Sequence, residues 1–227
     1  MLKKNDFVEI EYTAKLKEDG EVFDTTDEKV AKENDLYNES AAYGPIVVCV
    51  GERQVIEGLD MALEGKETGK SYTLEIKPEH AFGKKNSKLL KVVSTAAFRK
   101  QNIQPVPGLQ VNMDGILGTI RSVTGGRLVI DFNHPLSGKD IVYEVKLNRV
   151  VTDDAEKLRN YLEVQLNEKG AEVSLSNGEA TVTLSKEPSK TVQEKLIRKL
   201  SALLPAVKKV HFGVRKEPSK NVTSPEK

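Results

Sequence analysis

The sequence predicts an α+β fold that is divided among several small units. Hydrophobic residues make up 38% of the 227 residues and charged residues 30%, a balance typical of globular proteins. Apolar and polar residues alternate over 6–13 and over 141–150, as they do in half-buried strands. Leucines recur at helical spacing in short segments such as 153–166. The length allows one large domain or two to three small ones, and the changes of pattern along the chain favour the small ones.

The N-terminal part is expected to combine strands with one short helix. The strand over 6–13 places Val8, Ile10 and Tyr12 on one face. Asp19-Gly20 predicts a hairpin turn into a second strand over 21–24, and the polar residues that follow predict a long loop. The later elements are a strand over 46–50, a helix over 55–63 and a strand over 71–76.

Residues 84–131 break this pattern and are expected to form an inserted, small, mostly-β domain. The predicted elements are a strand over 89–93, a short helix from Ser94 through Gln101, and strands over 116–123 and 127–132. The alternation over 141–150 then resumes the pattern of the first domain. The first domain is therefore discontinuous, with residues 1–83 and 132–152.

Residues 153–227 are expected to form a C-terminal α/β domain with the order α-β-β-α-β. Asp153 is the predicted N-cap of its first helix, and Asn177-Gly178 predicts a hairpin. The apolar positions of the two helices are Leu158, Leu162, Leu166, Val192, Leu196, Leu200 and Leu203, and a strand over 207–214 ends the domain. A small core and an open-edged sheet predict a homodimer through 153–227, and the alternative is a cap that packs on its own chain.

Composition excludes several classes of function. The net charge is +1, with +5 over 155–227 and −4 over the preceding residues, so nucleic acid is not the expected partner. No apolar run approaches the roughly 20 residues that cross a bilayer, and no signal peptide is recognisable, so the expected location is the cytoplasm. The single Cys49, set among valines, predicts a buried structural thiol. The three histidines have no ligand spacing, so neither a metal nor a cofactor is expected.

Five short motifs occur in the order in which one enzyme family has them: Phe23-Asp24, Val55 to Asp60, Gly65 to Gly69, Ala81-Phe82-Gly83, and Ile141 to Val145. Over residues 1–152 the chain resembles the FKBP-type peptidyl-prolyl cis-trans isomerases. The insert and residues 131–139 resemble the SlyD subgroup, in which an insert-in-flap domain replaces the flap. A further C-terminal domain is similar in layout to the long-chain archaeal FKBP chaperones. The histidine- and cysteine-rich tail of SlyD is absent, so nickel binding is not implied.

The resemblance implies an FKBP-like antiparallel sheet wrapped on a short helix, with an apolar pocket between them. Taken alone, the apolar residues concerned favour a plain hydrophobic core over a pocket. The implied catalytic set is Tyr12, Phe23, Asp24, Ile46, Val55, Ile56, Leu59, Phe82 and Tyr143. Residues expected to bind substrate are His134 and Leu136 on the loop that leaves the insert, and Leu90, Val92, Phe98 and Val111 within it.

The implied function is peptidyl-prolyl isomerisation combined with a folding chaperone activity on unfolded or nascent polypeptides that contain proline. An apolar pocket that favours the twisted amide lowers the rotation barrier of about 18–20 kcal/mol without a covalent intermediate. Leu59 stands where the simple enzyme commonly has a tryptophan, which keeps open the alternative of a catalytically weak FKBP-like binding module or holdase. A third interpretation, a nucleic-acid or ribosome contact of residues 153–227, rests only on their positive charge.

Overall fold

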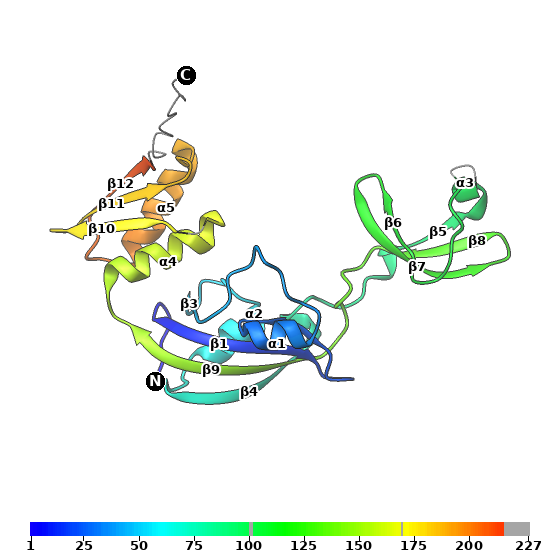
Figure 1. The fold of residues 1–227 in the computed structure, drawn as a ribbon, viewed down its shortest axis with the longest axis horizontal. Helices are drawn as coiled ribbons and strands as arrows, with labels where there is room; N and C mark the ends of the chain where they lie inside the picture. The colour runs from blue at the N-terminus through cyan, green and yellow to red at the C-terminus, as the bar shows by residue number, and fades with distance from the viewer. Residues whose placement is uncertain (100–101, 169, 216–227) are drawn as a thin grey trace, which may run out of the picture.

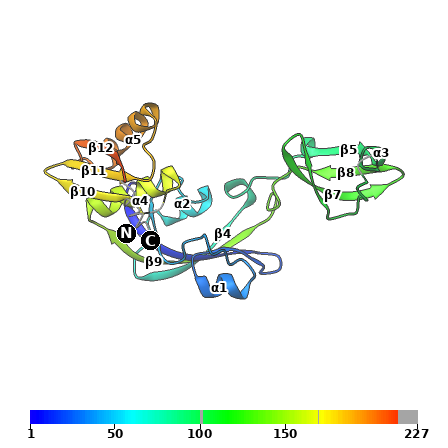
Figure 2. The same cartoon turned by 45° about the horizontal axis from the view of Figure 1, so that its top comes forward.

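The computed structural model describes residues 1–99, 102–168 and 170–215 and arranges them in three lobes, each built on its own sheet (Figure 1). We call them the first lobe (β1–β4 and β9), the insert lobe (β5–β8) and the C-terminal lobe (β10–β12). In two views the insert lobe stands apart from the other two at the end of two connecting segments (Figure 2). No helix within the described ranges is long and apolar enough to span a membrane.

The first lobe is a five-stranded antiparallel sheet in the order β2-β1-β9-β4, with β3 also paired to β1. Its strands are β1 (Phe7–Leu16), β2 (Val22–Thr25), β3 (Ile46–Cys49), β4 (Lys70–Ile76) and β9 (Ile141–Val151). Two short helices, α1 (Glu28–Glu33) and α2 (Glu57–Leu63), belong to this lobe, and a 3-10 turn (Pro78–His80) follows β4. Val8 and Ile10 are fully buried on the face predicted for them.

Helix α2 begins two residues later than the sequence predicts, because Ile56 has an extended backbone and stands at the N-cap. The buried Asp60 side chain accepts hydrogen bonds from the backbone amides of Gly51 (2.8 Å) and Arg53 (2.9 Å), which ties the helix to the turn after β3. At Gly58 a Cβ atom would lie 2.3 Å from Ile76 Cγ2. Glycine therefore allows α2 to lie close to the end of β4.

The insert lobe is a four-stranded antiparallel sheet in the order β5-β8-β7-β6 with one short helix. Its elements are a 3-10 turn (Ser87–Leu89), β5 (Leu90–Ser94), α3 (Thr95–Arg99), β6 (Gln110–Met113), β7 (Ile116–Thr124) and β8 (Arg127–Asp131). Strand β6 was not predicted from the sequence. The predicted end of the helix, Gln101, lies outside the described residues. Phe98, Val111, Ile120, Leu128 and Ile130 form the core.

The C-terminal lobe follows the predicted order α-β-β-α-β, with the three strands in the order β10-β11-β12. The elements are α4 (Asp154–Leu166), β10 (Glu172–Ser176), β11 (Glu179–Leu184), α5 (Lys190–Leu203) and β12 (Lys209–Val214). The Asp153 side chain caps α4 by accepting from the Glu156 amide at 2.7 Å. Val192, predicted to face the core, is 38% exposed at the start of α5. In the hairpin of β10 and β11, Leu175 lies directly opposite Ala180.

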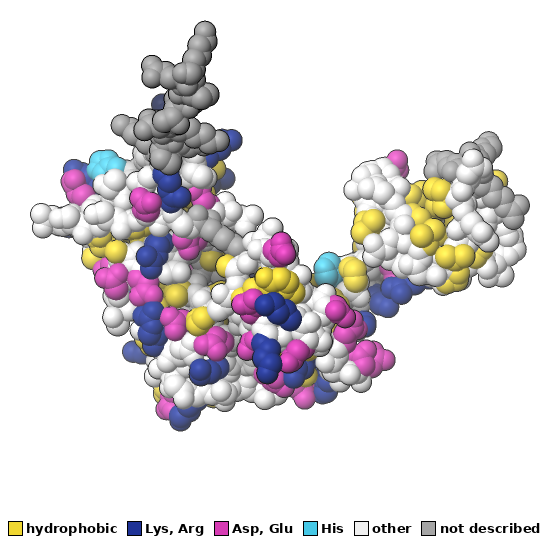
Figure 3. Space-filling view, viewed as in Figure 1, with side chains coloured by type: hydrophobic (Ala, Val, Ile, Leu, Met, Phe, Trp, Pro, Cys, Tyr) yellow, Lys and Arg dark blue, Asp and Glu magenta, His cyan; other side chains and the backbone are white. Residues whose placement is uncertain are grey.

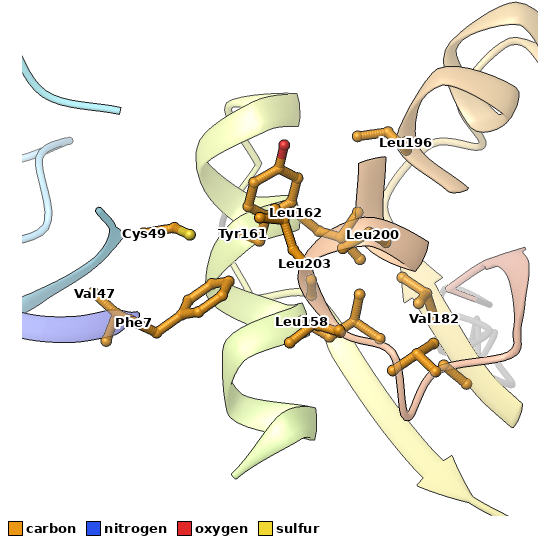
Figure 4. Packing of buried hydrophobic residues seen from close by; sticks show 14 of the residues in the cluster. Phe7, Val47, Cys49, Leu158, Tyr161, Leu162, Val182, Leu196, Leu200 and Leu203 are labelled. Carbon is orange, nitrogen blue, oxygen red and sulfur yellow. The ribbon is translucent and has the colours of Figure 1, made fainter. Parts of the chain in front are cut away.

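One hydrophobic core continues from the C-terminal lobe into the first lobe (Figure 4). Phe7 and Cys49 point at helix α4, where the Tyr161 ring meets the Phe7 ring edge to face at 6.5 Å. The buried thiol predicted for Cys49 is confirmed, since the residue is 0% exposed. Burial raises the pKa of this thiol to about 12. The other members of this core are Val47, Val151, Leu158, Leu162, Ala171, Ala180, Val182, Leu184, Leu196, Leu200, Leu203, Leu204 and Val207.

Candidate functional site

The nine residues of the predicted catalytic set come together in the first lobe. Tyr143 and Leu59 belong to its buried core, and seven others lie around that core with Asp24 exposed among them. The half-buried members are Tyr12, Phe23, Ile46, Val55, Ile56 and Phe82. They come from β1, β2, β3, α2 and the segment after β4, so distant parts of the sequence supply one apolar surface.

A cavity of about 340 Å³ opens beside this surface, between β1, β2, β3 and the long loop that contains α1. Tyr12, Phe23, Asp24 and Ile46 line it, as predicted for a pocket wall. Tyr43, from the long loop before β3, lines it as well. The Tyr43 hydroxyl also accepts a hydrogen bond from the Asn38 amide at 2.9 Å.

Asp24 and Tyr12 form the polar part of the cavity wall. The Tyr12 hydroxyl donates a hydrogen bond to Asp24 Oδ2 at 2.9 Å. Burial, and secondarily the negative charge of Asp24, raise the pKa of Tyr12 far above its usual range. The hydroxyl therefore stays protonated and holds the carboxylate in one orientation, in a wall that Thr25, Thr26 and Asn38 also line. Its ring also packs on that of Tyr143, with the centroids 5.3 Å apart.

Three rings form a row from the sheet toward the insert. Phe23 meets Phe82 edge to face with centroids 5.9 Å apart, and His134 stacks flat on Phe82 at 4.6 Å. His134 thus contacts the predicted pocket wall directly. Leu136 is half-buried on the same loop, where its backbone amide donates to His134 Nδ1 at 3.2 Å.

Leu59 and Tyr143 differ from the other predicted site residues because they are buried. Leu59 is 0% exposed on α2 and Tyr143 is 3% exposed on β9. A bound ligand therefore cannot touch the Leu59 side chain in this conformation. Leu59 is part of the buried core against which Val55 and Ile56 pack.

The four predicted substrate-binding residues of the insert lie on two opposite faces of its sheet. Phe98 and Val111 line a groove of about 570 Å³ with Ile103 and Met113. Leu90 and Val92 lie on the other face, because alternate residues of a strand point to opposite sides and Val93 belongs to the core cluster. The sequence treated these four as one surface, and the structure corrects this.

No group of three or more His, Cys, Asp or Glu side chains that could hold a metal ion is found in the described part of the chain. The arrangement offers a cavity of mixed polar and apolar lining, with one carboxylate held by a protonated phenol. Such a wall can hold an apolar ligand and orient one polar group. It contains no activated nucleophile, because the one thiol, Cys49, is buried in the core shared with the C-terminal lobe.

Comparison with known proteins identifies two family matches. Residues 1–101 match the family described as FKBP-type peptidyl-prolyl cis-trans isomerase, and residues 91–136 match the family described as FKBP26, IF domain. The chain is 35% identical over 156 residues to the short-type peptidyl-prolyl cis-trans isomerase of Methanocaldococcus jannaschii, covering 69% of this chain and 98% of that protein. It is 32% identical over 129 residues to the FKBP-type isomerase SlyD of Vibrio cholerae, covering 52% and 62% of the two chains.

Proposed function

The chain belongs to the FKBP-type peptidyl-prolyl cis-trans isomerases, and from this premise we propose that its reaction takes place in the cavity lined by Tyr12, Phe23, Asp24 and Ile46. It is a SlyD-like isomerase, a type of enzyme that acts on proline-containing polypeptides and has chaperone-like activity. The observation that carries the assignment of the site is that four of the nine predicted residues line one cavity and the other five belong to the apolar cluster beside it.

The proposed mechanism needs no covalent step. Rotation of an X-Pro bond passes through a twisted amide that has lost its resonance and is less polar than the planar form. A wall of Phe23, Ile46 and Ile56 solvates this form better than the hydrated planar one, and each ~1.4 kcal/mol of such preference gives a tenfold rate. Asp24, held by the Tyr12 hydroxyl, orients the polar part of the substrate.

This site is tested by measuring isomerisation of a short proline peptide by the full-length chain. Tyr12→Ala, at the cavity wall, and Ile56→Ala, in the apolar cluster beside the cavity, are expected to lower kcat/KM by on the order of tenfold or more, because both remove apolar surface at the proposed site. Val150→Ala is a matched control, since Val150 is 40% exposed on β9 outside the predicted set. Full activity in both folded variants would disprove the assignment. Little activity in the unchanged protein would favour the alternative of a binding module or holdase.

We propose the division of labour that the sequence suggested. Residues 1–83 and 132–152 form the isomerase domain, 84–131 the insert-in-flap chaperone domain, and 153–227 the C-terminal domain. Separate sheets for the three parts support this division.

The insert is proposed to capture unfolded chains along β6. This strand pairs with β7 on one side, and all four of its residues line the 570 Å³ groove on the other. An extended client segment can add to such an edge through backbone hydrogen bonds while its side chains enter the apolar groove. Captured chains then have a raised effective concentration at the isomerase cavity. Replacing residues 84–131 with a short loop should therefore preserve peptide isomerisation and strongly impair refolding of a protein limited by proline isomerisation.

We also propose a homodimer through residues 153–227. Its support is the sheet of the C-terminal lobe, where β10 and β12 are edge strands. The core that this lobe shares with Phe7 and Cys49 supports the alternative of a cap on its own chain. Light scattering separates the two: the dimer requires twice the chain mass of 25.1 kDa, and a monomer at tens of micromolar contradicts it.

A further inference from the structure

The net charge of +1 is the sum of three unequal parts. Residues 84–131 carry eight Lys or Arg against two Asp or Glu, a net charge of +6. Residues 1–83 together with 132–152 carry 13 against 21, a net charge of −8. A basic lobe beside an acidic one attracts acidic partners to itself, while the neighbour repels them.

The outer face of the insert sheet, opposite the groove, carries an exposed apolar strip. Leu90 is 44% exposed and Val92 is 65% exposed on β5. Val92 lies directly opposite Val129 of β8, whose neighbours Leu128 and Ile130 are fully buried on the inner face. We call Leu90, Val92 and Val129 the outer strip. A hollow of about 410 Å³ lies over Leu90 and Val129. Figure 3 shows hydrophobic side chains on the visible face of this lobe and basic ones along its lower edge.

Cations surround the outer strip. Lys85 and Arg121 line the same hollow, and Arg127 shares the strand and face of Val129. Lys85 and Arg127 have no carboxylate partner among the residues that the structure describes. The carboxylate in the hollow, Asp131, is 4% exposed and already accepts hydrogen bonds from Arg121 Nε (3.0 Å) and from the Asn133 amide (2.9 Å).

We infer that the outer strip is a second docking site for client chains, selective for extended segments in which apolar residues are accompanied by Asp or Glu. This inference rests on the proposal that the insert captures unfolded chains, and it names which of them are held most tightly. Apolar side chains cover Leu90, Val92 and Val129, while carboxylates pair with Lys85 and Arg127. Because the first lobe is acidic, the segment held here stays away from the isomerase cavity and leaves it free for a less acidic part of the same chain.

An acidic polypeptide fits this surface better than a nucleic acid does. Single-stranded nucleic acid binds through aromatic platforms on which bases stack. The residues of the outer strip are aliphatic, and the Phe132 ring packs against the core on the inner face of the sheet, with the Lys91 ammonium group 5.4 Å from the ring centroid. Aliphatic side chains flanked by unpaired cations suit apolar side chains interspersed with carboxylates.

The experiment measures fluorescence anisotropy of two short labelled peptides with the full-length protein: one alternates Leu with Asp, and the other has Lys in place of Asp. The Leu/Asp peptide is expected to bind on the order of tenfold more tightly, and its advantage should shrink between about 0.05 and 0.5 M NaCl. Val92→Ser and Lys85→Glu should each weaken it at least threefold, as an order-of-magnitude expectation. Val150→Ser and Lys186→Glu make the same changes at exposed sites in the other two lobes and should have no effect.

Three results would overturn the inference, and they also separate it from the proposed function. If neither peptide binds, capture by the insert fails together with this site. If both peptides bind equally and Ile103→Ser in the groove weakens them while Val92→Ser does not, capture holds and the outer strip has no role. If an oligothymidylate displaces the Leu/Asp peptide and loses affinity in Val92→Ser, the strip is a nucleic-acid site.

Discussion

The C-terminal lobe and the insert lobe are attached to the first lobe in opposite ways. Phe7 and Cys49 of the first lobe are buried in one core with Tyr161 of α4. The core of the insert lobe includes no strand or helix of the first lobe, and Phe132, the first residue after β8, packs against it. Its two connecting segments instead hydrogen-bond to one another, through Asn133 Oδ1 with the Asn86 amide (2.8 Å) and through the Gly138 amide with Gly83 O (2.8 Å).

This difference separates a structural lobe from a working one. Turning the C-terminal lobe would expose apolar surface that both lobes now bury, at about 25 cal/mol for each Å². Turning the insert lobe would disturb only its connecting segments and the stack of His134 on Phe82. The insert lobe, which is proposed to deliver chains to the neighbouring cavity, needs freedom to turn. The C-terminal lobe, which serves as a rigid frame for the first lobe, does not. The comparison therefore predicts how much each of the two lobes contributes to the stability of the first lobe.

The largest effect is expected from Tyr161→Ala. Removing a 3%-exposed ring from the shared core should lower the free energy of unfolding by about 3 kcal/mol, as for other large-to-small core substitutions. It should also uncover Cys49, so that alkylation at pH 8 becomes fast, whereas the unchanged protein resists because its thiol has a pKa of about 12. Val164→Ala, at a 45%-exposed position of the same helix, is the control. Equal stability and equal alkylation in both variants would mean that the lobes share no core.

A smaller loss is expected from Lys199→Met. The Lys199 ammonium group on α5 lies 2.8 Å from Glu52, whose side chain is only 8% exposed in the turn after β3. Removing the cation leaves that carboxylate without its partner and should cost about 1–2 kcal/mol of stability. The double variant Lys199→Met, Glu52→Gln should recover most of this loss, because a neutral amide tolerates burial better. Denaturant titration of Lys199→Met, Glu52→Gln and the double variant measures the free energy of unfolding, and additive effects of the two substitutions would exclude the pairing.

The sequence predicts local structure well in this protein, and it predicts very short strands and long-range pairings poorly. Alternation placed Val8 and Ile10 inside, and Asn177-Gly178 marked its hairpin, because both signals are local. Strand β6 was missed because four residues between two turns give no readable period. Which side Val92 faces depends on its pairing with Val129, far along the chain.

The same distinction between local and long-range signals applies to the candidate site. The motifs contain seven of its nine residues, all except Tyr12 and Ile46, and the structure brings all nine to one lobe. They did not predict that Leu59 is buried or that Tyr43 lines the cavity, because both depend on how the loop and helix pack. The contact of Phe7 with Tyr161 joins residues 154 positions apart and has no local signal.

A weaker link between the same two lobes is the cluster around Arg149. Its guanidinium group bonds Glu9 Oε2 at 2.8 Å and Glu156 at 2.6 Å, joining β1, β9 and the start of α4. The hydrogen bond from Arg149 lowers the pKa of Glu156 in the folded state. The bond therefore contributes stability above the unfolded pKa of about 4.3, and this is lost as the pH falls through the folded pKa. Arg149→Ala should thus destabilise the protein slightly at pH 7, less at high salt, and progressively less as the pH falls below about 4.3. A loss that is the same at pH 3 would point to packing instead.

The smallest effect on stability is expected from the largest change, replacement of residues 84–131 with a short loop. Gly83 O and the Gly138 amide are already hydrogen-bonded, so the ends that remain lie close together, and closing a short loop changes the free energy little. Because the core of the insert lobe includes no strand or helix of the first lobe, its removal uncovers no buried cluster there.

Truncation after residue 152 is the matched comparison, since it uncovers Phe7 and Cys49. Denaturant titration measures the free energy of unfolding of the first lobe. Removing the insert should change this free energy by no more than about 1 kcal/mol, and the truncation should lower it by several kcal/mol. If both deletions destabilise the first lobe equally, the two attachments are energetically alike, and the contrast between frame and working lobe is wrong.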